Sequence, residues 1–238
     1  MSTLKPITVY GQGGPNPPKV SMILTELGLP HTIEAIQFDK VKEPYYTAIN
    51  PNGRLPSIHD PNASPPLTLW ESGAIVEYLV ETYDTDHKIS FPKGTTEAYL
   101  AKQWSYFQAS GQGPYYGQFI WFKKFAPEDV PLAKTRYSNE IARVTGVLEK
   151  WLTKQTEEHG EGGMKKSNGP WLVGNKCSYA DIVFFMWQFM ASIMLSADEF
   201  DSEKFPAVKN WLARLKELKG VKQAAEATEA QMKGNAAH

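Results

Sequence analysis

The residues with the clearest capacity for chemistry lie in the segment 11–20, GQGGPNPPKV, between an apolar run and a helical run. Its three glycines suggest a loop that cradles phosphate. A dinucleotide fingerprint, however, needs a glycine at the sixth position, where this chain has Asn16. A phosphate loop needs Gly-Lys followed by Ser or Thr, and the chain offers Pro-Lys-Val. The pattern therefore argues against both kinds of nucleotide site.

The segment does offer the N-terminus of a helix, which we predict to begin at Pro18. The unpaired amides and the positive dipole at such an end favour an anion. Asn16 stands just upstream, and its side-chain amide can donate a further hydrogen bond. The alternative is that Asn16 caps the helix, because asparagine is a preferred residue at that position. The loop taken alone favours the capping role.

Metal and disulfide chemistry have little support. Cys177 is the single cysteine, which rules out an intrachain disulfide and a thiolate metal cluster, and the five histidines are scattered. We therefore expect no metal. Cys177 precedes a predicted capping box from Ser178 to Asp181. It is either a reactive thiol or, as we favour, a small apolar residue that pairs with Ile182 at the helix start.

The composition is that of an ordinary globular protein. Lysine and arginine number 25 against 26 aspartate and glutamate, so the net charge gives no support for nucleic acid or an anionic membrane as partner. No apolar run approaches the roughly 20 residues that span a bilayer, and the N-terminus lacks the apolar core of a secretion signal. These features predict a cytoplasmic protein.

Apolar spacing predicts an α+β arrangement for the first part of the chain. Two strands flank a helix and form a β-α-β unit, whose strands should run parallel. A hairpin and a second helix follow, with room for a short helix after Glu43. The predicted strands are 7–10, 32–38, 55–59 and 67–70, and the predicted helices are 18–28 and 71–83.

The second part of the chain is predicted to be entirely helical. A polar linker at 86–96 separates a domain at 1–85 from a helical domain at 97–238. We expect a surface loop at 157–169, where glycines cluster, and a C-terminal tail that frays. The predicted helices are 97–109, 115–125, 131–157, 179–195, 207–219 and 221–232.

Several motifs together resemble one family. These are NPNGRLPSI at 50–58 and LWESGAI at 69–75, with their spacing to GPNPPKV and the Ser178–Asp181 cap. They resemble the soluble glutathione transferases. WSYFQASG at 104–111 narrows the resemblance to the fungal class related to the yeast prion nitrogen regulator, which has a bacterial disulfide-bond reductase counterpart. The resemblance covers nearly the whole chain. It implies a thioredoxin-like N-terminal domain, an all-α C-terminal domain and a homodimer.

The resemblance also implies residues that bind glutathione. Leu55 and Pro56 would form a cis-proline turn, where Leu55 pairs its backbone with the cysteinyl part of glutathione. At the γ-glutamyl end, Glu71 would hold the ammonium group. Ser72 would hold the carboxylate through its hydroxyl and its backbone amide. Ser72 also falls at a predicted helix start, which favours a carboxylate independently of the resemblance.

The other end of glutathione and its sulfur complete the expected site. Arg54 and Lys42 would address the glycine carboxylate, although Lys42 is equally explained as a solvated surface charge. Asn16 falls where this class places an asparagine near the sulfur, which shifts our interpretation from a cap to a functional residue. There are two departures. Bacterial relatives have a threonine at the position of Gly14, and relatives often have glycine at the position of Pro17.

We therefore expect an enzyme without a permanent cofactor, which uses glutathione as co-substrate against a small electrophile or disulfide. Reduction of a disulfide or peroxide would have to use glutathione itself, because Cys177 is far from the loop in sequence. The rival hypothesis is a regulatory protein that binds glutathione with little turnover. Aromatic residues that could line the acceptor pocket, or equally belong to the core, are Tyr115, Tyr116, Phe119, Trp121 and Phe122.

Overall fold

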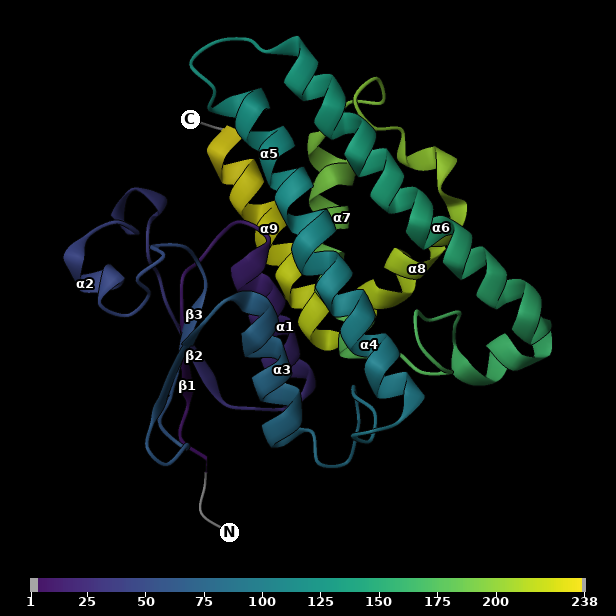
Figure 1. The fold of residues 1–238 in the computed structure, drawn as a ribbon, viewed down its shortest axis with the longest axis horizontal. Helices are drawn as coiled ribbons and strands as arrows, with labels where there is room; N and C mark the ends of the chain where they lie inside the picture. Colours follow the sequence, from purple (N-terminus) through teal and green to yellow (C-terminus); the bar gives the residue numbers. More distant parts are fainter. Residues whose placement is uncertain (1–3, 237–238) are drawn as a thin grey trace. The chain divides into compact units, whose positions relative to one another are not determined.

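The computed structural model describes residues 4–236, although the side chains of 159–167 and 233–236 are not described. The side chains of His159 and His238 thus lie outside the described residues, as does any fraying of residues 237–238. The chain forms two compact units (Figure 1). The first contains the residues up to Ser90 and those from Lys216 onward, and the second runs from Phe91 to Leu215. The C-terminal segment therefore groups with the N-terminal unit and not, as expected, with the helical domain.

The first unit contains a four-stranded mixed sheet. Its strands are β1 (Ile7–Tyr10), β2 (His31–Glu34), β3 (Ser57–Asp60) and β4 (Leu67–Trp70), in the order β2-β1-β3-β4. β1 and β2 are parallel, as the β-α-β pattern predicts, and β3 is antiparallel to both β1 and β4. The second strand ends at Glu34 instead of 38. Ile36 is buried but belongs to a separate segment, so the alternation at 32–38 is not one strand.

Four α-helices and a short 3-10 helix, η1 (Phe38–Lys40), complete the described part of this unit, and two of the α-helices lie side by side next to the sheet (Figure 1). The first helix carries a buried stripe that includes Val20, Ile23 and Leu24. It packs against the helix that follows the hairpin and also against the C-terminal helix. The helices are α1 (Asn16–Glu26), α2 (Pro44–Thr47), α3 (Ser72–Tyr83) and α9 (Lys219–Ala236).

The close packing of α9 on α1 depends on a glycine. A Cβ atom at Gly220 would lie 2.8 Å from the carbonyl oxygen of Met22 and 3.0 Å from Cβ of Thr25. Since real Cβ atoms do not approach backbone so closely, only glycine permits this approach. Val221 and Ala225 are buried on the same helix. The described part of α9 is therefore a packed element, and the expectation of a frayed tail is wrong for it.

The second unit is helical, as predicted, but two of its segments are continuous where breaks were expected. A π-helical segment, η2, joins two helices across the predicted Ser-Gly-Gln-Gly-Pro break. The longest helix continues through the predicted loop at 157–169 as far as Ser167, because each glycine in an established helix costs only about 1 kcal/mol. The elements are α4 (Thr96–Phe107), η2 (Gln108–Gln112), α5 (Gly113–Lys124), α6 (Pro131–Ser167), α7 (Tyr179–Met194), η3 (Ser202–Lys204) and α8 (Pro206–Lys216).

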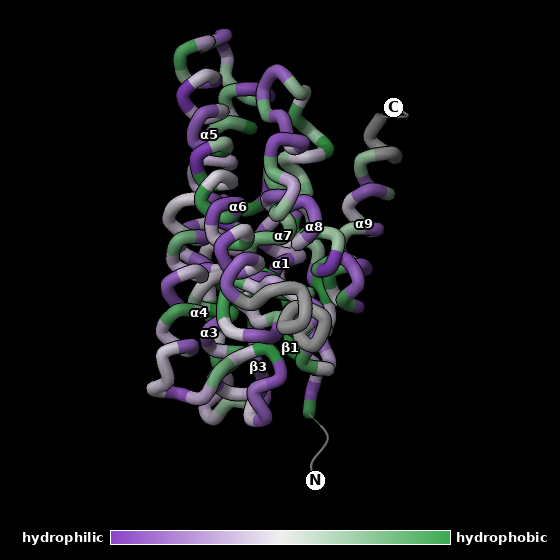
Figure 2. Tube along the Cα trace, turned by 90° about the vertical axis from the view of Figure 1, so that its right-hand side faces the viewer, coloured by the Kyte–Doolittle hydropathy of each residue, from purple (hydrophilic) through white to green (hydrophobic). Residues whose placement is uncertain are grey.

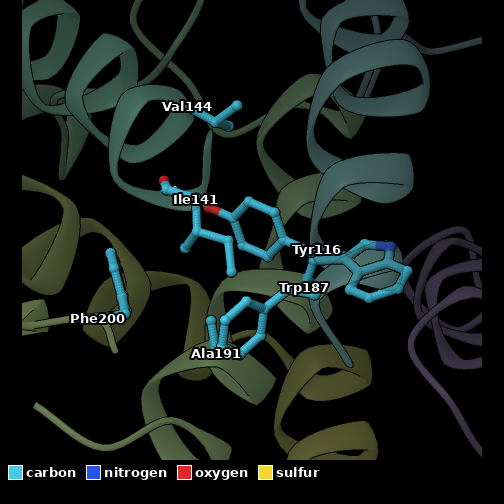
Figure 3. Packing of buried hydrophobic residues seen from close by; sticks show 7 residues of the cluster. Tyr116, Ile141, Val144, Trp187, Ala191 and Phe200 are labelled. Carbon is cyan, nitrogen blue, oxygen red and sulfur yellow. Dashed lines mark hydrogen bonds between the residues drawn. The ribbon is translucent and has the colours of Figure 1, made fainter. Parts of the chain in front are cut away.

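The core of the helical unit is rich in aromatic residues. Polar and apolar stretches follow one another along α5 (Figure 2), and Tyr116 and Phe119 are its buried residues. Figure 3 shows the ring of Tyr116 beside Ile141, in a cluster that also contains Trp187 and Phe200. Such packing fixes α5, α6 and α7 against one another.

The predicted capping box at the start of α7 is present. The carboxylate of Asp181 accepts hydrogen bonds from the backbone amide of Ser178 at 2.9 Å and from its hydroxyl at 3.2 Å. It also accepts from the Leu172 amide at 2.9 Å and from Nε1 of Trp211 at 3.0 Å. Asp181 therefore ties three segments of the unit together. The assignment of Cys177 as an apolar staple stays a prediction.

Candidate functional site

The segment that opened the sequence argument forms the N-terminus of α1. The helix begins at Asn16, two residues before the predicted start, and its N-cap is Pro15, which makes no side-chain cap bond. Asn16 therefore occupies the first helical position, one residue after the N-cap. Asn16 is half-buried. Pro17 and Pro18, which follow it in the first turn, carry no amide hydrogen, so the backbone donors of that turn are the amides of Asn16 and Lys19. The helix end can therefore receive an anion at Asn16.

The glycines before Asn16 serve close packing and not phosphate binding. Gly11 has φ +114°, and a Cβ atom there would lie 2.9 Å from Cδ2 of Leu55. Gly14 has φ +65°, and a Cβ atom there would lie 3.2 Å from Cζ of Phe38. Both positions combine a left-handed backbone with a close neighbour, a combination that favours glycine. The loop is thus held directly against Leu55.

Leu55 lies in the turn that the sequence predicted. The Leu55–Pro56 peptide bond is cis, as the resemblance implied. The carbonyl oxygen of Arg54 accepts hydrogen bonds from the hydroxyl of Tyr46 at 2.8 Å and from Nδ2 of Asn50 at 2.7 Å. Tyr46 and Asn50 are buried, so they hold the turn from within the unit. The backbone of Leu55 is thereby fixed beside the loop that leads into α1.

The side chain of Lys42 and the residue Arg54, the two cations expected at the glycine carboxylate, lie at the same turn, 52–54. Nζ of Lys42 donates to the carbonyl oxygen of Asn52 at 2.8 Å. The same side chain crosses Gly53, where a Cβ atom would lie 2.9 Å from Cδ of Lys42. Arg54 follows directly, and both cationic side chains are exposed. Lys42 is held by a hydrogen bond to the Asn52 backbone, and this position suits a carboxylate that approaches the turn.

Glu71 and Ser72 stand at the start of α3. Glu71 is the N-cap residue and has φ +70°, a left-handed conformation that costs a glutamate about 1–3 kcal/mol. Ser72 is the first helical residue and is half-buried. Its amide is one of the first N–H groups of α3, which have no carbonyl partner within the helix. Such strain commonly occurs at ligand-binding sites. Its coincidence with the predicted carboxylate site supports a functional role for this turn.

The structure adds Lys19, which the sequence argument missed. Lys19 is only 2% exposed, and its Nζ donates to Oγ of Ser72 at 3.0 Å. Burial lowers the pKa of Lys19 to about 7, and the nearby charge of Glu71 partly offsets this effect. The signal in the sequence was its position: Lys19 lies four residues before Ile23 in the buried stripe of α1.

Two further side chains flank the glycine loop. Gln231 of α9 lies beside Gly13, where a Cβ atom would be 3.4 Å from Nε2 of Gln231. Phe38, next to Gly14, is an exposed aromatic residue. Neither residue belongs to a recognisable sequence motif. Both were missed because tertiary packing alone brings them to the loop.

The aromatic residues proposed for the acceptor pocket divide into two groups. Tyr116 and Phe119 are 2% and 1% exposed and belong to the core of the helical unit (Figure 3). The hydroxyl of Tyr116 lies 2.9 Å from Oγ1 of Thr145 and accepts from Nε2 of Gln188 at 2.8 Å. With their surfaces buried, these two side chains cannot line a pocket, and the expectation for them is corrected.

The other three residues stay candidates for the acceptor pocket. Trp121 is 45% exposed and lies edge-on to Phe122, with ring centroids 4.9 Å apart. Phe122 stacks on Tyr137 at 5.7 Å, and Tyr115 is partly buried against the core cluster. These rings retain apolar surface near the end of α5.

Within the described part of the chain, three or more His, Cys, Asp or Glu side chains do not gather at one metal-binding point. None of the helices described across residues 4–236 combines the length and apolar character that a bilayer crossing requires.

Comparison with known proteins agrees with this geometry. Residues 14–82 match the glutathione S-transferase N-terminal domain, and residues 114–227 match the C-terminal domain. The glutathione S-transferase-like protein gedE of Aspergillus terreus is 58% identical over 94% of this chain and 96% of its own length. Protein URE2 of Eremothecium gossypii is 32% identical over 74% of this chain and 56% of its own length.

The fold of the chain is also similar to that of a solved structure. The glutathione transferase URE2P6 of Phanerochaete chrysosporium, crystallised with oxidized glutathione, has a TM-score of 0.83. It is 43% identical and the match covers 95% of this chain and 97% of that one. The similarity thus extends over both units of the chain.

Proposed function

The chain belongs to the glutathione S-transferase family, and from this membership we propose that it binds glutathione and activates its thiol for attack on an electrophile. One observation carries the proposal. Three separate segments meet in the N-terminal unit, because Gly11 packs on Leu55 and Lys19 bonds to Ser72. These two contacts support the proposal that the N-terminus of α1, the cis-proline turn and the N-terminus of α3 form a single glutathione site.

Each part of glutathione has a chemical counterpart at this site. The γ-glutamyl carboxylate is received by the hydroxyl and amide of Ser72, and its ammonium group by Glu71. The cysteinyl backbone pairs with Leu55 in the manner of an added strand. Lys42 and Arg54 neutralise the glycine carboxylate. The sulfur is thereby directed toward Asn16 at the start of α1.

The energetics of thiol activation are within reach of these groups. A thiol with a pKa of about 8.5 is only a few per cent ionised at neutral pH. Lowering the pKa to about 6.5 requires about 2.7 kcal/mol of preferential stabilisation of the thiolate. One hydrogen bond to a charged group contributes roughly 1.5–3 kcal/mol, and a helix N-terminus roughly 0.3–1 kcal/mol. The Asn16 amide and the helix end therefore suffice together.

The ionised sulfur supports conjugation and reduction alike. In conjugation, it displaces a leaving group from an electrophilic carbon. In reduction, it attacks a disulfide and forms a mixed disulfide with release of one thiolate, and a second glutathione thiolate then releases the other thiolate and forms oxidised glutathione. Neither route uses a protein thiol. Cys177, the single cysteine, belongs to the helical unit near the start of α7 and not to the loop before α1.

The proposal includes a homodimer in the cytoplasm, where the thiol pool is kept reduced. Tyr99 and Tyr106 lie seven residues apart on α4 and are strongly exposed, so they share one face of the helix. Exposed aromatic residues on one face are typical of a protein interface. Sedimentation of the wild type and of a Tyr99→Glu, Tyr106→Glu variant tests this assembly. A wild-type monomer contradicts it.

Activity is tested with an aryl halide and with a small disulfide, using the wild type, Asn16→Ala and Cys177→Ser. We expect glutathione binding and turnover of at least one substrate in the wild type, with kcat/KM reduced about 10- to 100-fold in Asn16→Ala. Cys177→Ser should match the wild type. Loss of disulfide reduction in a folded Cys177→Ser variant would show that the thiol takes part in chemistry.

Two other outcomes separate the alternatives. Glutathione binding without turnover of either substrate supports the regulatory interpretation, in which the site senses glutathione. Absence of glutathione binding by the folded wild type contradicts the proposal altogether.

A further inference from the structure

Lys19 is a buried ammonium group without a role in the reaction just described. It is 2% exposed, and its Nζ lies 3.0 Å from Oγ of Ser72. A buried charge is costly unless hydrogen bonds and an opposite charge compensate it. Evolution more often fills such a position with an apolar side chain. The ammonium group therefore needs an explanation that includes its contact with Ser72.

The helix that carries Lys19, α1, packs against β1, α3 and α9, and each of these elements has titratable side chains. On α3, Tyr78 donates to Asp60, and on α9, Glu229 pairs with Lys216 at 3.0 Å. The pKa of Tyr10 on β1 is raised by burial and by Glu34. Glu26, on α1 itself, accepts from the Gly220 amide.

Glu71 is the carboxylate whose charge acts on Lys19, and its side chain is exposed to solvent. Solvent screens an exposed charge, so the attraction between Glu71 and Lys19 is weakened. A carboxylate bound at Ser72 would bring a second negative charge near the Lys19 ammonium group, which lies 3.0 Å from Oγ of Ser72.

The direction of the Lys19–Ser72 hydrogen bond depends on the proton of Lys19. An ammonium group has three donors and no acceptor, so it must donate to Oγ of Ser72. The hydroxyl proton of Ser72 is then available to a ligand. A neutral amine has a lone pair and can accept that proton instead, which leaves an oxygen lone pair turned toward the ligand. The first arrangement attracts a carboxylate and the second repels it.

Resting on the proposed glutathione site, we propose that Lys19 is a positioning residue that orients the Ser72 hydroxyl toward the γ-glutamyl carboxylate and takes up a proton from solvent when this carboxylate binds. The carboxylate places a negative charge beside the buried amine and so favours its protonated form. Binding and protonation of Lys19 therefore support each other. Free protein near pH 8 holds Lys19 mostly neutral, since burial lowers its pKa to about 7.

The sign of the pH dependence follows by linkage. The bound state holds Lys19 protonated to higher pH than the free state, so raising the pH above about 7 weakens binding. Affinity should fall by up to about tenfold for each pH unit until the pKa of the complex is reached. Ionisation of the glutathione thiol releases a proton, whereas protonation of Lys19 takes one up, so the two effects change the affinity in opposite directions as the pH rises.

Titration calorimetry with S-methylglutathione tests the proposal without interference from the thiol, because the methylated sulfur does not ionise. Binding at pH 8 is measured in phosphate and in Tris, whose protonation enthalpies differ, and the difference gives the number of protons taken up. The variants are Lys19→Met, which lacks the titrating group, and Lys19→Arg, which stays charged. Lys222→Met on an exposed position of α9 is the matched control.

We expect proton uptake to be larger in the wild type and in Lys222→Met than in both Lys19 variants, by most of one proton. Lys19→Arg should bind S-methylglutathione with an affinity that changes little between pH 7 and pH 9. Proton uptake by the amino group of the ligand contributes equally to all variants, so it cancels when their uptakes are compared. Should Lys19→Met and Lys19→Arg fail to fold, a measurement on the wild type at pH 5.5 provides the second test, because Lys19 is already protonated there and the uptake seen at pH 8 should be lost.

Two results are distinguishable. Binding to the wild type with equal proton uptake in the Lys19 variants, or with the same uptake at pH 5.5 as at pH 8, overturns the role of Lys19 and leaves the proposed function intact. Absence of S-methylglutathione binding to the folded wild type overturns the proposed function, and the role of Lys19 with it.

Discussion

The carboxylate of Glu26 on α1 accepts a hydrogen bond from the backbone amide of Gly220 on α9 at 2.7 Å, between residues 194 positions apart. The C-terminal helix is thereby fastened to the helix that begins at Asn16. Farther along α9, Gln231 reaches the glycine loop that precedes Asn16. The geometry of the candidate site thus depends on the last helix of the chain as well as on the first.

Gly220→Ala should destabilise the protein by about 1–3 kcal/mol, because its Cβ atom would lie 2.8 Å from the Met22 carbonyl oxygen. Chemical denaturation measures the effect. Gly146→Ala in α6 is the control, since its Cβ atom would meet only an ordinary contact at 3.9 Å. That substitution should stabilise the protein by up to about 1 kcal/mol. Equal effects of the two substitutions would contradict the close packing of α9.

Gly14→Thr introduces the threonine that the family resemblance suggests for the bacterial counterpart at this position. It should not raise activity, because Gly14 has φ +65° and a Cβ atom there would lie 3.2 Å from Phe38. The left-handed backbone should cost about 1–2 kcal/mol of stability. Denaturation and steady-state kinetics measure both effects. A stable variant with increased kcat would show that the loop accepts a second activating group.

Asp181 should give the protein a characteristic dependence of stability on pH. Burial raises the pKa of its carboxyl group to about 6, although four hydrogen bonds oppose the shift. The folded protein therefore binds this proton more tightly than the unfolded chain. The stabilisation is complete below about pH 4 and is lost as the pH rises through about 6, with a total of up to about 3 kcal/mol.

Comparison with Asp181→Asn isolates this contribution, since the variant does not titrate at the position. The stability advantage of the wild type over the variant should shrink between pH 4 and pH 7. Denaturation at several pH values measures it. An advantage that grows with pH would mean that the four hydrogen bonds outweigh burial.

The variants Tyr116→Phe and Trp121→Ala test which of these aromatic residues belongs to the core and which lines the acceptor pocket. The first variant loses hydrogen bonds to Thr145 and Gln188 and should cost about 1–3 kcal/mol of stability, with an unchanged preference among electrophiles. The second removes a half-exposed ring and should change KM for bulky aromatic electrophiles with little loss of stability. An altered preference in Tyr116→Phe would return this residue to the acceptor site.

Local patterns were sufficient for much of the fold. The β-α-β unit, the hairpin and the capping box at Ser178 each depend on residues close in sequence, and all were predicted. These features depend on local hydrogen bonds or backbone preferences, which can be recognised from the types of a few neighbouring residues. The cis-proline turn at Leu55 and Pro56 was implied by the family resemblance and not by the residues alone.

Features that arise from packing between distant segments were missed. Lys19 carries a charge, and its burial is decided by α3, which the sequence of α1 does not contain. The position of α9 depends on one glycine that fits against Met22. Tyr116 and Trp121 have the same aromatic character in sequence, and only the surrounding helices make one core and the other half-exposed.

The central claim is that the protein ionises glutathione beside Asn16. Ultraviolet difference titration of the bound thiolate measures this most directly, in the wild type and in Asn16→Ala. We predict an apparent pKa of about 6.5 for the bound thiol in the wild type and a value closer to the free one, about 8.5, in the variant. A wild-type pKa that stays near the free value, with glutathione bound, would contradict the account.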